Sequence, residues 1–284
     1  MKFTYTLIAV LTMLGNPLLI PAGGAPKPSE DGPKVIPDKG SGSGELDLSA
    51  FPGQVVNDVV VPVPSEIFSV LDKLGDPDWK AQLSRVPIIT FNERTDVALL
   101  LGATVAEGFI AVQAEDVKTV ENIGRDVLNL ATALGVREDV IRHCQSISNA
   151  ATASKWDVVR TELDATQSTV RRRMEDLRDG ALAECVSVGG WLRGTEVITS
   201  VITRSYSLER ADLLSQPDLA DYFNDALENM LTTAKNPLKL KVIADGVAHI
   251  REIMDTGEQS MTAQGVQEIN RISASLVKAI NTNK

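Results

Sequence analysis

The sequence predicts an all-α fold, either an antiparallel bundle or an array of helical hairpins, with about nine helices. Composition gives the first indication. Hydrophobic residues make up 43% of the 284-residue chain, and aromatic residues make up only 4%. The hydrophobic residues are mainly Ala, Leu, Val and Ile, which suit closely packed helices better than a sheet sandwich. Periodicity gives the second, since apolar residues recur every three or four positions from Pro64 to the C-terminus. Short connections between these stretches favour antiparallel neighbours.

The beginning of the chain has the organisation of a secretory signal peptide, residues 1–25. Lys2 forms the positive n-region, residues 3–14 form the apolar region, and Gly23 and Ala25 are the small residues before a cleavage site. A Gly-Asn-Pro sequence then interrupts the apolar run well short of the roughly 20 residues that a membrane span requires. We therefore expect cleavage after Ala25, and an exported protein, periplasmic or extracellular, without a stable membrane span.

Two segments without helical spacing follow the signal peptide. Residues 26–50 are rich in Pro, Gly, Ser and charged residues, which predicts a flexible leader. The next stretch contains five valines before Pro62, and we expect a short extended arm there, because Pro62 and Pro64 are incompatible with a central strand of a sheet. Residues 51–284, which include this arm at their start, are predicted to form a single all-helical domain.

Helices are predicted along the rest of the chain from apolar spacing and from helix-start and helix-stop residues. They cover residues 65–75, 78–85, 92–116, 117–134, a stretch around 140–147, 156–177, 181–205, 217–234, 240–254 and 266–280. The stretch 92–116 is apolar nearly all round between Val97 and Val112, so it should be the central helix.

Two capping boxes are predicted in the C-terminal half. Ser154 with Asp157 has the required spacing before one long helix, and Ser215 with Asp218 repeats that spacing before another. Pro217 lies between the second pair, in the first turn, where proline is well tolerated. We therefore expect both serines to cap the helices that follow them.

The charge of the chain excludes some classes of partner. The net charge is −10 at pH 7, and loss of Lys2 with the signal peptide makes it about −11. Nucleic-acid binding requires a dense basic patch, and residues 171–173, all arginine, form the only basic run, which is typical of a solvated helix face. We expect neither nucleic acid nor an anionic membrane surface as a partner.

The two cysteines, Cys144 and Cys185, leave two alternatives open. An oxidising compartment would permit a disulfide between them, which could contribute about 4 kcal/mol to stability if the geometry allows it. The other possibility is a pair of free thiols that behave as small buried apolar groups.

Recognisable catalytic, metal and cofactor motifs are missing from the sequence. The two histidines, His143 and His249, fall in different predicted helices without a partner at metal-ligand spacing. The chain has no G-x-S-x-G nucleophile motif, and its glycine-rich segments do not lie between a strand and a helix, where phosphate would bind. We therefore expect no cofactor and no metal, and we assign no catalytic residue.

A carboxylate in the most apolar predicted helix is the first candidate for a site. Glu107 has Ala103, Phe109 and Ile110 as neighbours. A buried charge must find a cation, find hydrogen-bond donors, or become neutral through a raised pKa. Asp96 lies eleven residues earlier on the same face, which suggests a polar line along this helix.

The second candidate is the segment 189–196, Gly-Gly-Trp-Leu-Arg-Gly-Thr-Glu. Glycine inside a helix usually serves close helix packing. A groove is the other interpretation, with Trp191 as an apolar wall and Arg193, three residues before Glu196, binding an anion or Glu107. The predicted ligand-binding residues are thus Asp96, Glu107, Trp191, Arg193 and Glu196.

From these features we expect an exported, soluble, non-enzymatic helical protein that acts as an interaction or ligand-binding module. The alternative is a carboxylate-based enzyme or metal-dependent protein, in which Asp96, Glu107 and Glu196 would meet in an internal cleft between helices. The identity of the ligand or partner protein and the oligomeric state do not follow from the sequence.

Overall fold

The computed structural model describes residues 54–56, 59–61, 64–84, 93–176, 179–232, 234, 237–257 and 259–282. All of them belong to one compact unit, Leu46–Lys284. The predicted signal peptide and leader lie outside the described residues. Within the described part, nine α-helices of ten or more residues and one shorter helix confirm the predicted all-α fold.

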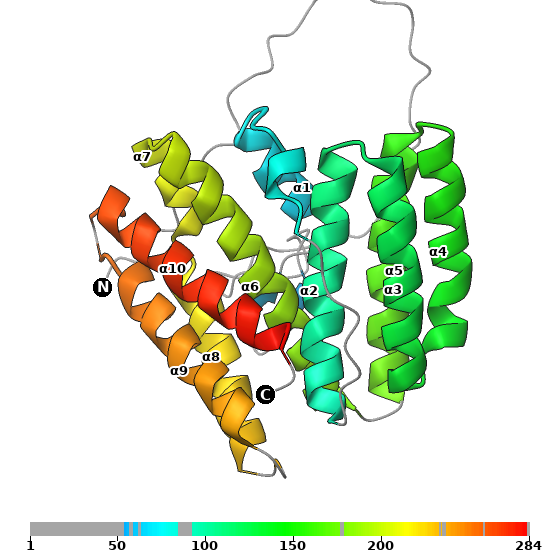
Figure 1. Cartoon of the computed structure of the whole chain (residues 1–284). Helices are drawn as coiled ribbons and strands as arrows, with labels where there is room; N and C mark the ends of the chain where they lie inside the picture. The colour runs from blue at the N-terminus through cyan, green and yellow to red at the C-terminus, as the bar shows by residue number, and fades with distance from the viewer. Residues whose placement is uncertain are drawn as a thin grey trace, which may run out of the picture. The chain divides into compact units, whose positions relative to one another are not determined.

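From α2 onward the helices follow one another with short connections (Figure 1). They are α1 (Pro64–Lys73), α2 (Arg94–Gln113), α3 (Val117–Leu134), α4 (Arg137–Thr152), α5 (Trp156–Asp176), α6 (Gly180–Arg204), α7 (Leu208–Ala211), α8 (Pro217–Leu231), α9 (Pro237–Met254) and α10 (Ala263–Ile280), with the 3-10 turns η2 (Lys80–Gln82) and η3 (Asp212–Leu214).

The valine-rich arm is extended, as predicted, and it pairs with itself. Strands β1 (Gln54–Val56) and β2 (Val59–Val61) form an antiparallel hairpin in which Val55 lies opposite Val60. The second strand packs against α8. The arm is therefore a two-stranded hairpin on a helix rather than a single strand.

Helix α2 is the central helix that its sequence predicts. Fourteen of its twenty residues are buried, and it contacts α3, α6 and α10 (Figure 1). Among the described helices, α2 alone is long and apolar enough to cross a membrane, and 78% of that apolar stretch is buried inside the protein. Its apolar surface is thus covered by neighbouring helices on all sides.

The helices form two groups of four that meet at α2 and α6. In the first group, α2, α3, α4 and α5 contact one another in chain order, and α5 also contacts α2. In the second group, α6 contacts α8 and α10, and α9 contacts both of these. The most extensive contact between any two helices joins α2 to α6. These closed contacts favour a bundle over an open array of hairpins.

Helices α2, α3 and α4 end with the same backbone turn. Glu115, Gly135 and Ser154 have positive φ angles of 51°, 81° and 55°. In each case the next residue donates its N–H to a carbonyl in the last turn of the helix, at 2.9–3.0 Å, which is the Schellman arrangement. The prediction that Ser154 caps α5 is therefore wrong, because Ser154 ends α4.

Two other sequence predictions need correction. The predicted helix 78–85 is only the short turn η2, because the backbone groups of Gln82 and Ser84 bond to side chains of α6 and α2 instead of continuing a helix. Ser215 does not cap α8 either: Gln216 occupies the N-cap position without a side-chain hydrogen bond. Pro217 is at the start of α8, as predicted.

Candidate functional site

The site predicted from the sequence lies where α2 and α6 touch. A Cβ atom on Gly102 would lie 1.9 Å from the carbonyl oxygen of Val186, and one on Gly189 would lie 2.0 Å from that of Leu99. Only hydrogen fits in either place, so the two backbones are in direct contact. The close-packing interpretation is confirmed at Gly189, whereas Gly194 has no atom of a neighbouring element within 4 Å.

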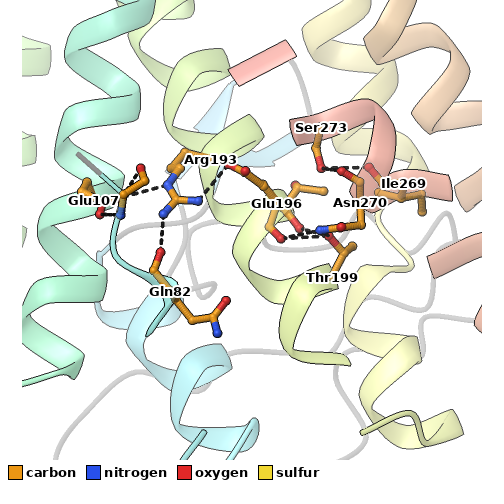
Figure 2. A network of polar contacts seen from close by, with 10 residues as sticks. Gln82, Glu107, Arg193, Glu196, Thr199, Ile269, Asn270 and Ser273 are labelled. Carbon is orange, nitrogen blue, oxygen red and sulfur yellow. Dashed lines mark hydrogen bonds and ion pairs between the residues drawn. The ribbon is translucent and has the colours of Figure 1, made fainter. Parts of the chain in front are cut away.

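Arg193 lies one turn after Gly189 and therefore faces α2. Its Nε donates to Glu107 Oε2 at 2.8 Å, its Nη1 to Glu196 Oε2 at 2.8 Å, and its Nη2 to the carbonyl oxygen of Gln82 at 2.6 Å (Figure 2). The side chains of Arg193 and Glu107 are 5% and 1% exposed. The guanidinium thus joins α2, α6 and the last residue of η2 inside the protein.

Burial raises the pKa of Glu107 above its ordinary value, and the charge and hydrogen bonds of Arg193 offset part of this effect. The backbone N–H of Ser84 also donates to Glu107 Oε1, which favours the ionised carboxylate. Of the outcomes left open for a buried carboxylate, Glu107 has both a cation, Arg193, and a hydrogen-bond donor, Ser84. The structure therefore satisfies this carboxylate internally.

The polar network continues from α6 to α10 (Figure 2). Asn270 Nδ2 donates to the carbonyl oxygen of Glu196 at 2.9 Å and to Thr199 Oγ1 at 3.0 Å. Thr199 Oγ1 donates in turn to the carbonyl oxygen of Thr195 at 2.6 Å. These bonds join α10 to α6, and with the Arg193–Glu107 bond the network connects α2, α6 and α10, which is a structural role.

Two of the five predicted site residues lie elsewhere. Trp191 is two residues before Arg193, about 200° around the helix, and its ring packs on Phe223 of α8 with centroids 5.4 Å apart. Asp96 pairs with Lys239 of α9 at 2.9 Å. A groove walled by Trp191 and containing Arg193 is thus not formed, because the two side chains face different neighbours.

The two cysteines are free thiols on different helices. Cys144 is half-buried on α4, while Cys185 is buried on α6, where its Sγ lies 3.5 Å from Met230 Sδ. Burial, with smaller effects from the charges of Glu184 and Asp96, raises the pKa of Cys185 to about 12. Of the two alternatives left open by the sequence, the structure has the unbonded one.

Two surface depressions lie along α5. A depression of about 540 Å³ is lined by residues of α1 and α5 that include Phe68, Asp72, Lys73, Arg160 and Asp164. A second, of about 400 Å³, is lined by Glu115 and the five residues 154–158 at the start of α5. Neither depression is lined by Glu107, Arg193 or Glu196.

Arg160 organises the first depression. Its guanidinium donates to Asp72 Oδ2 at 3.0 Å and to Gln113 Oε1 at 2.8 Å, and it lies 4.5 Å from the ring centroid of Phe68. The hydrogen bond from Arg160 lowers the pKa of Asp72. Sequence reasoning missed this pair because its members are 88 residues apart and carry no motif.

Within the described ranges, no group of three or more His, Cys, Asp or Glu side chains is placed to hold a metal ion. Comparison of the chain with models of protein families, with curated proteins and with solved structures finds no match.

Proposed function

We propose that this chain is an exported, non-enzymatic binding protein that takes its ligand on the surface along α5. The observation that carries the proposal is the pair of depressions that follow one another on this helix. Their linings on α5 begin at Trp156 and end at Asp164, about 12 Å apart at 1.5 Å per residue. An extended chain of a few residues could occupy both depressions at once.

The lining suggests a ligand that carries both positive and negative groups. The first depression has Asp72 and Asp164 with Lys73 and Arg160. The second combines Lys155 and two carboxylates with an aromatic and an aliphatic side chain. Polar groups of both signs around apolar contact area are typical of sites that orient a small ligand. A short peptide of mixed charge has the matching chemistry.

Trp156 offers a direct test, because it lines the second depression. The protein from Pro26 onward would be titrated with a hexapeptide of alternating Lys and Glu, with a Gly-Ser hexapeptide as the neutral control, and tryptophan fluorescence recorded. We expect a saturable change with the charged peptide only. Trp156→Phe should remove the signal, while calorimetry should still detect binding.

A matched pair of lysine variants locates the binding surface. Lys155→Ala should weaken binding by about tenfold, the effect of 1.4 kcal/mol on affinity. Lys241→Ala, an exposed lysine of α9 paired with Asp245, should leave the affinity unchanged. Equal effects of the two variants, or equal binding of the neutral peptide, would refute the proposed site.

Export has its own test. When the full chain is expressed in a bacterial host, the N-terminus of the protein recovered from the periplasm or the medium should be Pro26. Recovery of the chain with Met1 intact in the cytosol would contradict export without affecting the binding proposal.

The carboxylate-enzyme alternative gains no support from the arrangement of its residues. Asp96 pairs with Lys239, whereas Glu107 and Glu196 share Arg193. General acid-base chemistry requires a carboxyl group within reach of a substrate proton, and the side chain of Glu107 is only 1% exposed. We therefore put forward the binding function alone.

A further inference from the structure

A second cluster of polar and titratable side chains lies between α4 and α5, away from the Arg193–Glu107 ion pair. His143 Nδ1 is 2.6 Å from Glu162 Oε1, and His143 Nε2 is 3.0 Å from Thr169 Oγ1. Glu162 and Thr169 are two turns apart on α5, and the imidazole of α4 lies between them. The side chains of His143 and Glu162 are 20% and 25% exposed, so the cluster is accessible from solvent.

The hydrogen bonds assign the role of each atom. An ionised carboxylate only accepts, so Nδ1 of His143 carries the proton that is donated to Glu162. In the neutral imidazole, Nε2 is then an acceptor, and the hydroxyl of Thr169 donates to it. This is the order of carboxylate, imidazole and hydroxyl in which a hydroxyl becomes a nucleophile.

The behaviour of the neighbouring hydroxyls makes Thr169 distinct. Thr161, Thr166 and Ser168 of the same helix donate to the carbonyl oxygens of Asp157, Glu162 and Asp164, each four residues earlier. Hydroxyl groups inside helices commonly make this local bond. The hydroxyl of Thr169 instead points across to another helix and meets a base.

We propose that Thr169 is a covalent acylation site that accepts an acyl group from an activated donor such as a thioester or an aryl ester. Oγ1 of Thr169 attacks the acyl carbon while its proton passes to Nε2 of His143. The bond from the acyl carbon to the leaving sulfur or oxygen then breaks, and the leaving group takes up the proton. The product is an ester on Thr169.

A charged group assists this step. The carboxylate of Glu162 stabilises the imidazolium that forms on His143. The inference goes beyond the proposed binding function and does not depend on it.

The test uses p-nitrophenyl acetate with the protein from Pro26 onward. Release of p-nitrophenolate gives the rate, and mass spectrometry of the digested protein locates the acetyl group. We expect one acetyl group per chain, on Thr169. His143→Gln and Glu162→Gln should each slow labelling by about a hundredfold, the low end of the usual effect of a general base.

Conservative variants distinguish reaction at Thr169 from a purely structural role. Thr169→Ser keeps the hydroxyl and should still be labelled, whereas Thr169→Val should not. Thr166→Val is the matched control, since that hydroxyl lies on the same helix but bonds to a backbone carbonyl, and it should label at the original rate. Acetylation of His143 or of surface lysines alone, or equal loss in the Thr166 variant, would overturn the proposal.

Discussion

Arg193 donates hydrogen bonds to three partners, namely Glu107, Glu196 and the carbonyl oxygen of Gln82. Taking a carboxylate and a guanidinium out of water costs several kcal/mol for each ion, which their attraction repays only when further hydrogen bonds satisfy the remaining atoms. Here Glu196, the carbonyl of Gln82 and the N–H of Ser84 supply those bonds. The pair therefore also holds the described residues Gln82 and Ser84 against α6 and α2.

Arg193→Met should destabilise the protein by about 3–5 kcal/mol, because it leaves Glu107 as a buried charge without a cation. Urea unfolding at neutral pH measures the loss. Arg271→Met is the control, since Arg271 pairs with Glu268 on the exposed surface of α10, and it should leave the stability nearly unchanged because water screens such pairs. Similar losses in the two variants would mean that the buried pair contributes no more than a surface pair.

The loss of stability caused by Arg193→Met should depend on pH. The pKa of Glu107 is raised in the folded protein above its ordinary value of 4.5. The stabilisation that this raised pKa contributes is therefore complete below that value, and it is lost as the pH rises through the pKa of the folded protein. Removing Arg193 removes the charge that lowers the pKa, so the loss in Arg193→Met should be smaller at about pH 4 than at about pH 7. An equal loss at both would contradict the assignment.

The extent to which the sequence predicts the site differs between residues. The need of Glu107 for a partner follows from its apolar helix, and Arg193 is an available candidate because it lies among helix-packing glycines. The contacts of Asp96 and Trp191 do not follow from the sequence, because they depend on which neighbouring helix packs on that face of α2 or α6. The pair of Asp72 and Arg160 depends on tertiary contact alone.

At the scale of elements, the contact between α2 and α6 requires glycine at defined positions. Gly189→Ala should destabilise the protein by more than about 3 kcal/mol or prevent folding, since the added Cβ meets backbone that cannot move alone. Gly194→Ala on the same helix has open space around it and should stabilise by up to about 1 kcal/mol through helix propensity. Thermal unfolding of both variants measures this difference in stability. If the protein tolerates both changes, the prediction is wrong.

The three Schellman turns offer a second contrast. Ser154→Gly and Glu115→Gly should each stabilise the protein by about 0.5–1 kcal/mol, because glycine adopts a positive φ without steric cost. Gly135→Ala should destabilise it by about 1 kcal/mol for the same reason. Chemical denaturation measures all three, and a loss of stability in both glycine variants would show that side-chain contacts of Ser154 and Glu115 outweigh the backbone effect.

Most helices were predictable from apolar spacing, and their starts were less so. α3 has the predicted bounds, and Gly135 ends it as expected. The capping prediction at Ser154 fails because the same residue can begin one helix or end the previous one, and the left-handed conformation of a serine has no clear sequence signal. Helix length thus follows from local pattern, whereas the residue at a boundary depends on the turn.

At the scale of the whole molecule, burial is uneven. Fourteen of the twenty residues of α2 are buried, against three of the sixteen of α4. Regions with few buried contacts open at lower free energy than the core. Native-state hydrogen exchange should therefore be slowest in α2 and α6 and faster in α4 and α5. Uniform protection across these helices would instead indicate that the described unit opens only by global unfolding.

The contact between α2 and α6 can form only late during synthesis of the chain. Glu107 and Arg193 are 86 residues apart, so α2 leaves the ribosome long before the helix that covers its glycine-containing face. Contacts of such large sequence separation form slowly. Throughout that delay an apolar helix is without its main partner and is open to aggregation with other copies of the chain or to capture by a chaperone.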